Sequence, residues 1–107
     1  MSSQTVLIPY GFAENVCSMI KSHVFRRVKT HAFTFRFFCA NQTESDVIIK
    51  EATKIIISDV VPVFKDKIDI QWRFSFVPNS PVTSYPLRKR VNYKPYVVLC
   101  YFNTTQI

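Results

Sequence analysis

A basic run with flanking tyrosines carries the clearest chemistry of this sequence. Its cations are Arg88, Lys89, Arg90 and Lys94. Guanidinium and ammonium groups at this density bind phosphates through charge-assisted hydrogen bonds. Tyr85 and Tyr93 flank the run, and aromatic rings beside cations stack on unpaired bases. The run therefore predicts an arm that binds nucleic acid, with a solvated surface loop or a localisation signal as the alternatives.

The charges of the chain are segregated along the sequence. The net charge is +7, yet six of the seven acidic residues lie between Glu44 and Asp69. Residues 15–43 and 71–107 contain no acid. Cations concentrated in acid-free stretches produce a coherent positive field that attracts polyanions. This distribution favours a nucleic-acid partner.

Further cations fall within the expected helices and strands. Lys21, Arg26, Arg27 and Lys29 occupy the first expected helix and its end, where the polar side of a helix is the alternative interpretation. Arg36 and Arg73 alternate with apolar residues in two expected strands. We expect these two arginines to share one sheet face with Thr34 and Gln71.

Catalytic and metal-binding patterns are missing from the sequence. The single glycine, Gly11, excludes a glycine-rich phosphate loop. Cys17, Cys39 and Cys100 form no metal-ligand spacing with His23 and His31, which we expect at the surface and at a strand edge. The three cysteines are expected to be small buried side chains in a reducing compartment. We expect a non-catalytic protein without metal or cofactor, and a small hydrolase is the disfavoured alternative.

The hydrophobic pattern alternates between the periods of strands and helices. Strands are predicted at residues 5–10, 31–40, 68–76 and 96–102, and helices at residues 14–29 and 46–64. Val16, Ile20, Val24 and Val28 form the expected apolar stripe of the first helix. Thr43 or Ser45 is expected to cap the second helix, and Pro62 to tighten or end it. The prediction is one two-layer α/β domain of 107 residues, with a four-stranded mixed sheet and both helices on one face.

In this βαβαββ order, the chain resembles the Alba superfamily of small basic proteins that bind DNA or RNA. The resemblance is carried by residues 5–8, 64–70 and 87–91, which match the first strand, the second helix-to-strand junction and the basic hairpin of the family. It implies that Lys50 replaces a family lysine early in the second helix. The C-terminal domain of translation initiation factor three shares the strand order and is a competing fold.

Two departures from the family pattern bear on function. Residues 40–43 replace the glycine-arginine turn before the second helix, and residues 10–13 replace the lysines after the first strand. They favour a divergent ribonucleoprotein subunit, similar to the paired small subunits of ribonuclease P or MRP, over an Alba-type chromatin protein that binds DNA. The other alternative is a protein-interaction or scaffold module with an acidic partner.

The sequence also predicts a partner chain. The final strand has apolar groups on both faces, and the second helix has more isoleucines than one stripe can bury. Alba-type proteins pair, and the net charge of +7 disfavours pairing of like chains, so we expect a heterodimer with a related chain and a homodimer as the alternative. No leader or membrane segment is predicted. The expected location is intracellular: nuclear or nucleolar for a ribonuclease P or MRP-like subunit, otherwise cytoplasmic.

Overall fold

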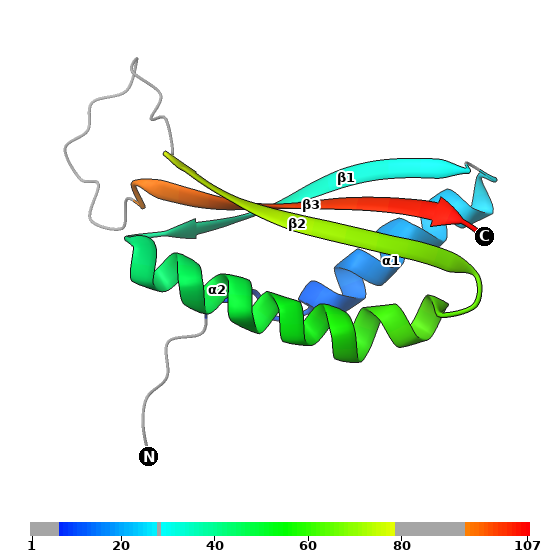
Figure 1. The fold of residues 1–107 in the computed structure, drawn as a ribbon, viewed down its shortest axis with the longest axis horizontal. Helices are drawn as coiled ribbons and strands as arrows, with labels where there is room; N and C mark the ends of the chain where they lie inside the picture. The colour runs from blue at the N-terminus through cyan, green and yellow to red at the C-terminus, as the bar shows by residue number, and fades with distance from the viewer. Residues whose placement is uncertain (1–6, 28, 79–93) are drawn as a thin grey trace.

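The fold is two helices packed on an antiparallel sheet. The computed structural model describes residues 7–27, 29–78 and 94–107. In chain order the elements are α1 (Phe12–Phe25), β1 (Thr30–Cys39), α2 (Gln42–Ile55), a π-helical turn η1 (Ile56–Val60), a 3-10 turn η2 (Val61–Phe64), β2 (Ile68–Pro78) and β3 (Tyr96–Gln106). Both helices lie on the same side of the sheet, so no described helix covers its other face (Figure 1).

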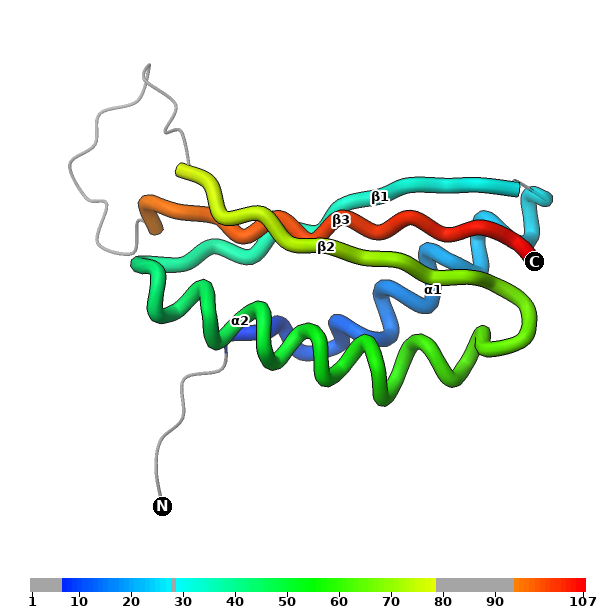
Figure 2. Tube along the Cα trace, viewed as in Figure 1, coloured from blue at the N-terminus to red at the C-terminus, as the bar shows by residue number. Residues whose placement is uncertain are grey.

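The last strand of the chain lies at the centre of the sheet. The strand order is β1-β3-β2, and β3 is antiparallel to both neighbours. Phe102 of β3 is paired with Phe33 on one side and with Trp72 on the other. The Cα trace shows the three strands side by side above the two helices (Figure 2). Because side chains alternate along a strand, this register decides which residues share each face.

The prediction of a four-stranded mixed sheet is wrong for the described residues, which form three antiparallel strands. Residues 7–10, the described part of the expected first strand, form no strand. Pro9 has no N–H to donate to a ladder, and its carbonyl accepts a bond from the Phe12 amide at the start of α1. The segment turns directly into the helix, for which Gly11 adopts a left-handed φ of 84°. Ile8 is buried in the core without belonging to the sheet.

The inward stripe of α1 differs from the predicted one near its end. Phe12, Val16, Ile20 and His23 are the buried residues of α1. Each four-residue step advances about 400° around a helix, so a stripe drifts by about 40° and must return by a three-residue step. His23 therefore faces inward, while Val24 is 39% exposed. The expectation that His23 lies at the surface is wrong, and Val28 lies outside the described residues.

The second predicted helix is confirmed, with a different cap. The Asn41 side chain accepts a hydrogen bond from the Glu44 amide at 2.9 Å, and Glu44 Oε1 accepts one from the Ala40 amide at 2.8 Å. This reciprocal pair satisfies amides that a helix start leaves free. At the other end the Val61 amide bonds to the Ile56 carbonyl, five residues back. Pro62 follows, and since it lacks an N–H, the chain continues as a 3-10 turn.

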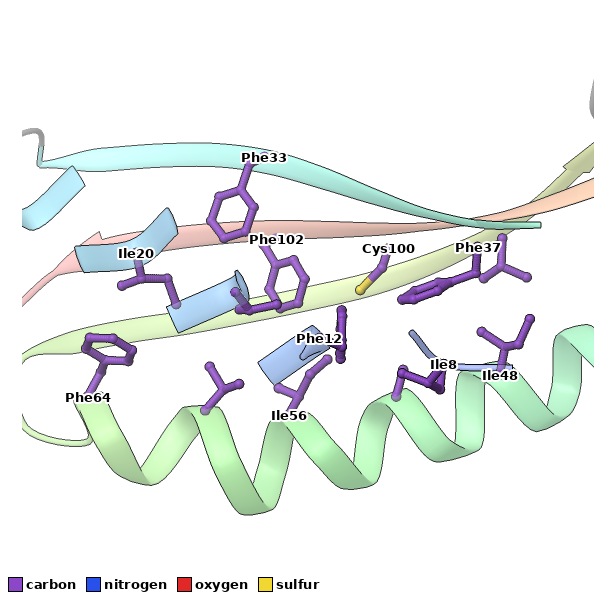
Figure 3. Packing of buried hydrophobic residues seen from close by; sticks show 14 of the residues in the cluster. Ile8, Phe12, Ile20, Phe33, Phe37, Ile48, Ile56, Phe64, Cys100 and Phe102 are labelled. Carbon is purple, nitrogen blue, oxygen red and sulfur yellow. The ribbon is translucent and has the colours of Figure 1, made fainter. Parts of the chain in front are cut away.

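The core lies between the sheet and the helix layer. Figure 3 shows Phe33, Phe102 and Cys100 pointing from the sheet toward Ile48 and Ile56 of the other layer. Phe33 and Phe102 are stacked, with ring centres 5.0 Å apart. Phe12 packs edge-on against the rings of Phe35 and Phe37, which ties the start of α1 to β1. The aromatic stripe predicted for the core thus packs under the helices, although Trp72, Phe74 and Phe76 of the edge strand β2 are only half-buried.

Candidate nucleic-acid interface

The face of the sheet away from the helices combines cations, two aromatic rings and polar amides. The register places the following residues on it: Thr30, Ala32, Thr34, Arg36 and Phe38 of β1; Val97, Leu99, Tyr101, Asn103 and Thr105 of β3; and Asp69, Gln71, Arg73, Ser75 and Val77 of β2. We call this set the open face. The shared face predicted for Thr34, Arg36, Gln71 and Arg73 is confirmed.

The centre of the open face is an arginine lying over a tyrosine. The Arg73 guanidinium carbon is 4.4 Å from the centre of the Tyr101 ring. Thr34 is paired with Tyr101 on the other side, and Gln71 is paired with Asn103 in the next row. A shallow hollow of about 380 Å³ is lined by Thr34, Gln71, Arg73, Tyr101 and Asn103, among others. Rings, guanidinium planes and side-chain amides are the groups that recognise unpaired bases in proteins.

Two arginines flank the central strand from opposite edges. Arg36 of β1 is paired with Leu99, and Arg73 of β2 is paired with Tyr101 two residues further on. With strands about 4.8 Å apart and a rise of about 3.4 Å per residue, their Cα atoms lie roughly 12 Å apart. Both side chains are exposed. Asp69, the one acid of the open face, lies four residues from Arg73, roughly 13 Å along β2.

Cys39, Cys100 and His23 are buried in the core, whereas Cys17 and His31 are only partly buried. Burial raises the pKa of the Cys100 thiol to about 12, and burial is also the main cause that raises the pKa values of Cys17 and Cys39. A thiol with a raised pKa is a poor nucleophile at neutral pH. The rings of His23 and His31 are stacked with centres 3.2 Å apart, on the helix side of the sheet. Within residues 7–27, 29–78 and 94–107, no three His, Cys, Asp or Glu side chains are grouped to hold a metal ion.

Most of the predicted basic arm lies outside the described residues. The arm residues outside the described ranges are Tyr85, Arg88, Lys89, Arg90 and Tyr93. Lys94 is described, and its ammonium is 3.8 Å from the Glu44 carboxylate at the start of α2. Glu44 also accepts a hydrogen bond from the Ala40 amide as part of the helix cap. The carboxylate that Lys94 faces is therefore already fixed in place by the start of α2. Pro78 is paired with Tyr96, so both flanks of the arm meet at one end of the sheet.

The helical cations are not brought to the open face. Lys21 lines a hollow between α1 and η1, together with Glu14 and Asp59. Lys50 is exposed on α2, in the layer on the other side of the sheet. Arg26, Arg27 and Lys29 are exposed in the connection from α1 to β1, where Arg27 takes a left-handed φ of 60° after the helix. The predicted cations therefore divide into separate groups, and Arg36 and Arg73 are the pair that the sheet brings together.

Tyr101 and Asn103 belong to the open face but were not among the candidate site residues predicted from the sequence. They occur in an apolar strand where every second residue is buried, so the pattern shows only that Tyr101 and Asn103 share a face. Their opposite parity to the buried Cys100 and Phe102 was the available indication. The sequence pattern could not show that β3 lies between β1 and β2, the two strands that carry the arginines.

Comparison with protein-family models, with curated proteins and with solved structures finds no match to this chain. The resemblance to the Alba superfamily therefore remains a prediction. None of the helices in the described part of the chain is both long and apolar enough to cross a membrane.

Proposed function

We propose that this chain binds single-stranded RNA on the open face of its sheet, as a non-catalytic subunit of a ribonucleoprotein. The observation that carries the proposal is the Arg73 guanidinium over the Tyr101 ring, on a sheet face that neither α1 nor α2 covers. Arg36 adds a second cation to this face, and Gln71 and Asn103 add hydrogen-bonding amides. In this arrangement the arginines bind phosphates, and a base stacks on the ring or the guanidinium plane.

The geometry favours a single strand over a duplex. Sequence readout of duplex DNA commonly uses a helix or a two-stranded ribbon inserted into the major groove. Here the cations and the tyrosine lie on a broad three-stranded face, with both helices behind it. Splayed bases can lie along such a face, whereas the bases of a duplex are stacked on one another. The Alba resemblance points the same way and suggests a ribonuclease P or MRP-like particle.

The basic arm extends the proposed interface. Its flanks, Pro78 and Tyr96, meet at one end of the sheet. Arg88, Lys89 and Arg90 then contribute phosphate contacts, and Tyr85 and Tyr93 contribute stacking. Replacing the three consecutive cations by alanine is expected to weaken binding across all RNA sequences and to flatten the salt dependence. An unchanged affinity of this triple variant would remove the arm from the proposal.

The decisive experiment compares two double variants of equal charge change. Binding of a fluorescein-labelled 12-nucleotide RNA is measured by anisotropy at several salt concentrations. Arg36→Gln with Arg73→Gln is expected to weaken binding about tenfold and to lower the slope of log K against log salt by about 1.4, since each lost phosphate contact contributes roughly 0.7. Lys50→Gln with Lys54→Gln is the control on the helix layer and is expected to change affinity less than twofold.

Equal effects of the two double variants would overturn the proposed face, because the loss of RNA affinity would then depend only on the net charge of the chain. Matched DNA and duplex RNA are run in parallel and are expected to bind more weakly. Competition by poly-glutamate as strong as that by RNA would instead support the alternative of an interaction module with an acidic partner.

Exposed apolar residues support the proposed pairing with a related chain. Phe25 is 88% exposed and Ile107 is 81% exposed, and both line a hollow of about 670 Å³ with Val24 and Val63. A contiguous apolar patch of this kind marks a partner surface in many proteins. We place the heterodimer contact here. Light scattering of the isolated chain at high salt, where charge repulsion is screened, tests it: a monodisperse monomer at high concentration contradicts the pairing.

A further inference from the structure

A groove on the helix layer has the opposite electrostatic character to the open face. It lies where the segment before α1 and the first turn of α1 meet one stripe of α2, and its volume is about 750 Å³. It is lined by Leu7, Ile8, Pro9, Tyr10, Gly11, Phe12, Ala13, Glu14, Glu44, Val47, Glu51, Ile55 and Asp59. Volumes of about 300–1,000 Å³ are typical of ligand sites in proteins. We call this site the acidic groove.

The apolar lining of the groove is accessible. Tyr10 is fully exposed, and Val47 is 43% exposed on the stripe of α2 that borders the groove. Leu7 and Ile55 are only partly buried. A neighbouring hollow of about 480 Å³ shares Ala13, Glu14 and Asp59 with the groove and continues it between α1 and η1. The site is therefore elongated, which suits an extended chain segment better than a compact small molecule.

The described charged residues that line the groove itself are acids, although Lys21 lines the neighbouring hollow beside Glu14 and Asp59. Four of its lining residues are acids, and among residues 7–27, 29–78 and 94–107 no lysine or arginine lines it. At one end of the groove, the Glu44 carboxylate forms an ion pair with the Lys94 ammonium, with Oε1 and Nζ 3.8 Å apart. In the part of the chain that the structure describes, Glu14, Glu51 and Asp59 have no cation within salt-bridge distance. A positively charged occupant would complement these acids.

We infer that the acidic groove binds a segment of a partner protein in which lysine or arginine alternates with apolar residues. The apolar side chains contact Val47 and Ile55, and the cations pair with Glu14, Glu51 and Asp59. The net charge of +7 does not prevent this, because the Debye length is about 8 Å at physiological salt and the field at the groove is local. Residues 1–6 of this chain have no lysine or arginine side chain, so charge complementarity disfavours them as the occupant.

The experiment uses a defined probe and the full chain. A fluorescein-labelled 12-residue peptide that alternates lysine or arginine with leucine or valine is titrated with protein at 0.1 M salt. Two control peptides replace every cation with glutamate, or every apolar residue with serine. The wild-type chain is expected to bind the first peptide with 1:1 stoichiometry, and each control peptide at least fivefold more weakly.

Matched charge variants locate the binding site. Glu51→Gln with Asp59→Asn is expected to weaken peptide binding about tenfold, since it removes two carboxylates without changing side-chain size. Asp46→Asn with Asp66→Asn removes the same charge outside both the groove and the open face and is expected to change peptide affinity less than twofold. Val47→Ser tests the apolar contact and is expected to weaken binding about threefold. The urea midpoint of each variant confirms that it remains folded.

Four outcomes would overturn the inference. The first two are no binding by the wild-type chain, and equal weakening by the two charge pairs. The third is binding that appears only after residues 1–6 are deleted, which would make this chain's own N-terminus the occupant. The fourth is a dimer that dissociates in the Glu51→Gln, Asp59→Asn variant, which would make a second copy the occupant. RNA affinity measured on the same variants is expected to stay within twofold, so this inference and the proposed function can fail separately.

Discussion

The Arg73 guanidinium lies over the Tyr101 ring at 4.4 Å, and the two residues are directly paired across β2 and β3. The pair holds a cation against the sheet instead of leaving it extended into solvent. A ligand on the open face therefore meets a preorganised plane with a positive charge. Preorganisation of this kind lowers the entropy lost when a long side chain is immobilised on binding.

The first prediction separates stacking from charge on the open face. Tyr101→Phe is expected to change RNA affinity less than twofold, because the ring and its position under Arg73 are kept. Tyr101→Leu is expected to weaken binding about tenfold, since base–aromatic stacking contributes about 1–3 kcal/mol. Anisotropy titration with the 12-nucleotide RNA measures both variants.

A charge-only ligand provides the control for this prediction. Binding of inorganic polyphosphate, which has no bases, is expected to change little in Tyr101→Leu. If Tyr101→Leu binds RNA as well as the wild-type chain, the ring is not a stacking platform.

The second prediction concerns a buried histidine. His23 Nδ1 is buried without a hydrogen-bond partner in the described part of the chain, and the ring is stacked on His31. Burial, then His31 and then Arg26, lower the pKa of His23 below its ordinary value of 6.5. Below about pH 6.5 the unfolded chain therefore binds a proton at His23 more readily than the folded chain does. The contribution of His23 to the free energy of unfolding is fully present above about pH 6.5 and is lost as the pH falls below that value.

Urea unfolding between pH 5 and pH 8 measures this dependence. The wild-type free energy of unfolding is expected to decline below about pH 6.5, while His23→Leu, which keeps an apolar side chain at the site, is expected to decline less over the same range. Parallel profiles for the two chains would show that His23 does not contribute to the pH dependence.

The third prediction concerns the core residue at the centre of the sheet. Phe102 is 1% exposed and is stacked on Phe33. Phe102→Ala is expected to reduce the free energy of unfolding by about 3–5 kcal/mol, because it leaves a cavity between the layers. Ile57→Ala, at a side chain that is 55% exposed, is the control and is expected to change it by less than about 1 kcal/mol. Similar urea midpoints for the two variants would contradict this packing.

The fourth prediction ranks the cysteines by reactivity. Cys39 and Cys100 are fully buried, whereas Cys17 is only partly buried, and burial raises the pKa of all three thiols. With a maleimide at pH 7.5, Cys17 is expected to react first, more slowly than a free thiol, and the other two only as the chain unfolds. Mass spectrometry over time, with Cys17→Ser as the control, follows each site. Labelling of Cys100 as fast as Cys17 would contradict the buried position.

The sequence alone determined three of the strands, the second helix and the separation of the sheet faces. Apolar alternation in β1 and β2 predicted both strands and the shared face of Arg36 and Arg73, because side-chain parity is a property of the strand itself. Periodicity predicted α2, whose length exceeds an ordinary strand. The segregation of the acids into one segment predicted a coherent positive field over the rest of the chain, because it depends only on residue order.

Only the tertiary structure decided how these elements combine. The order β1-β3-β2 places Tyr101 between the two arginine-bearing strands, and it also leaves residues 7–10 outside the sheet. The acidic groove likewise forms where the segment before α1 meets α2. These contacts join residues far apart in sequence, and their pairing depends on burying the whole apolar face of the sheet at once. The periodicity of a single segment shows which of its side chains point together, but the neighbour they meet is chosen by packing of the entire chain.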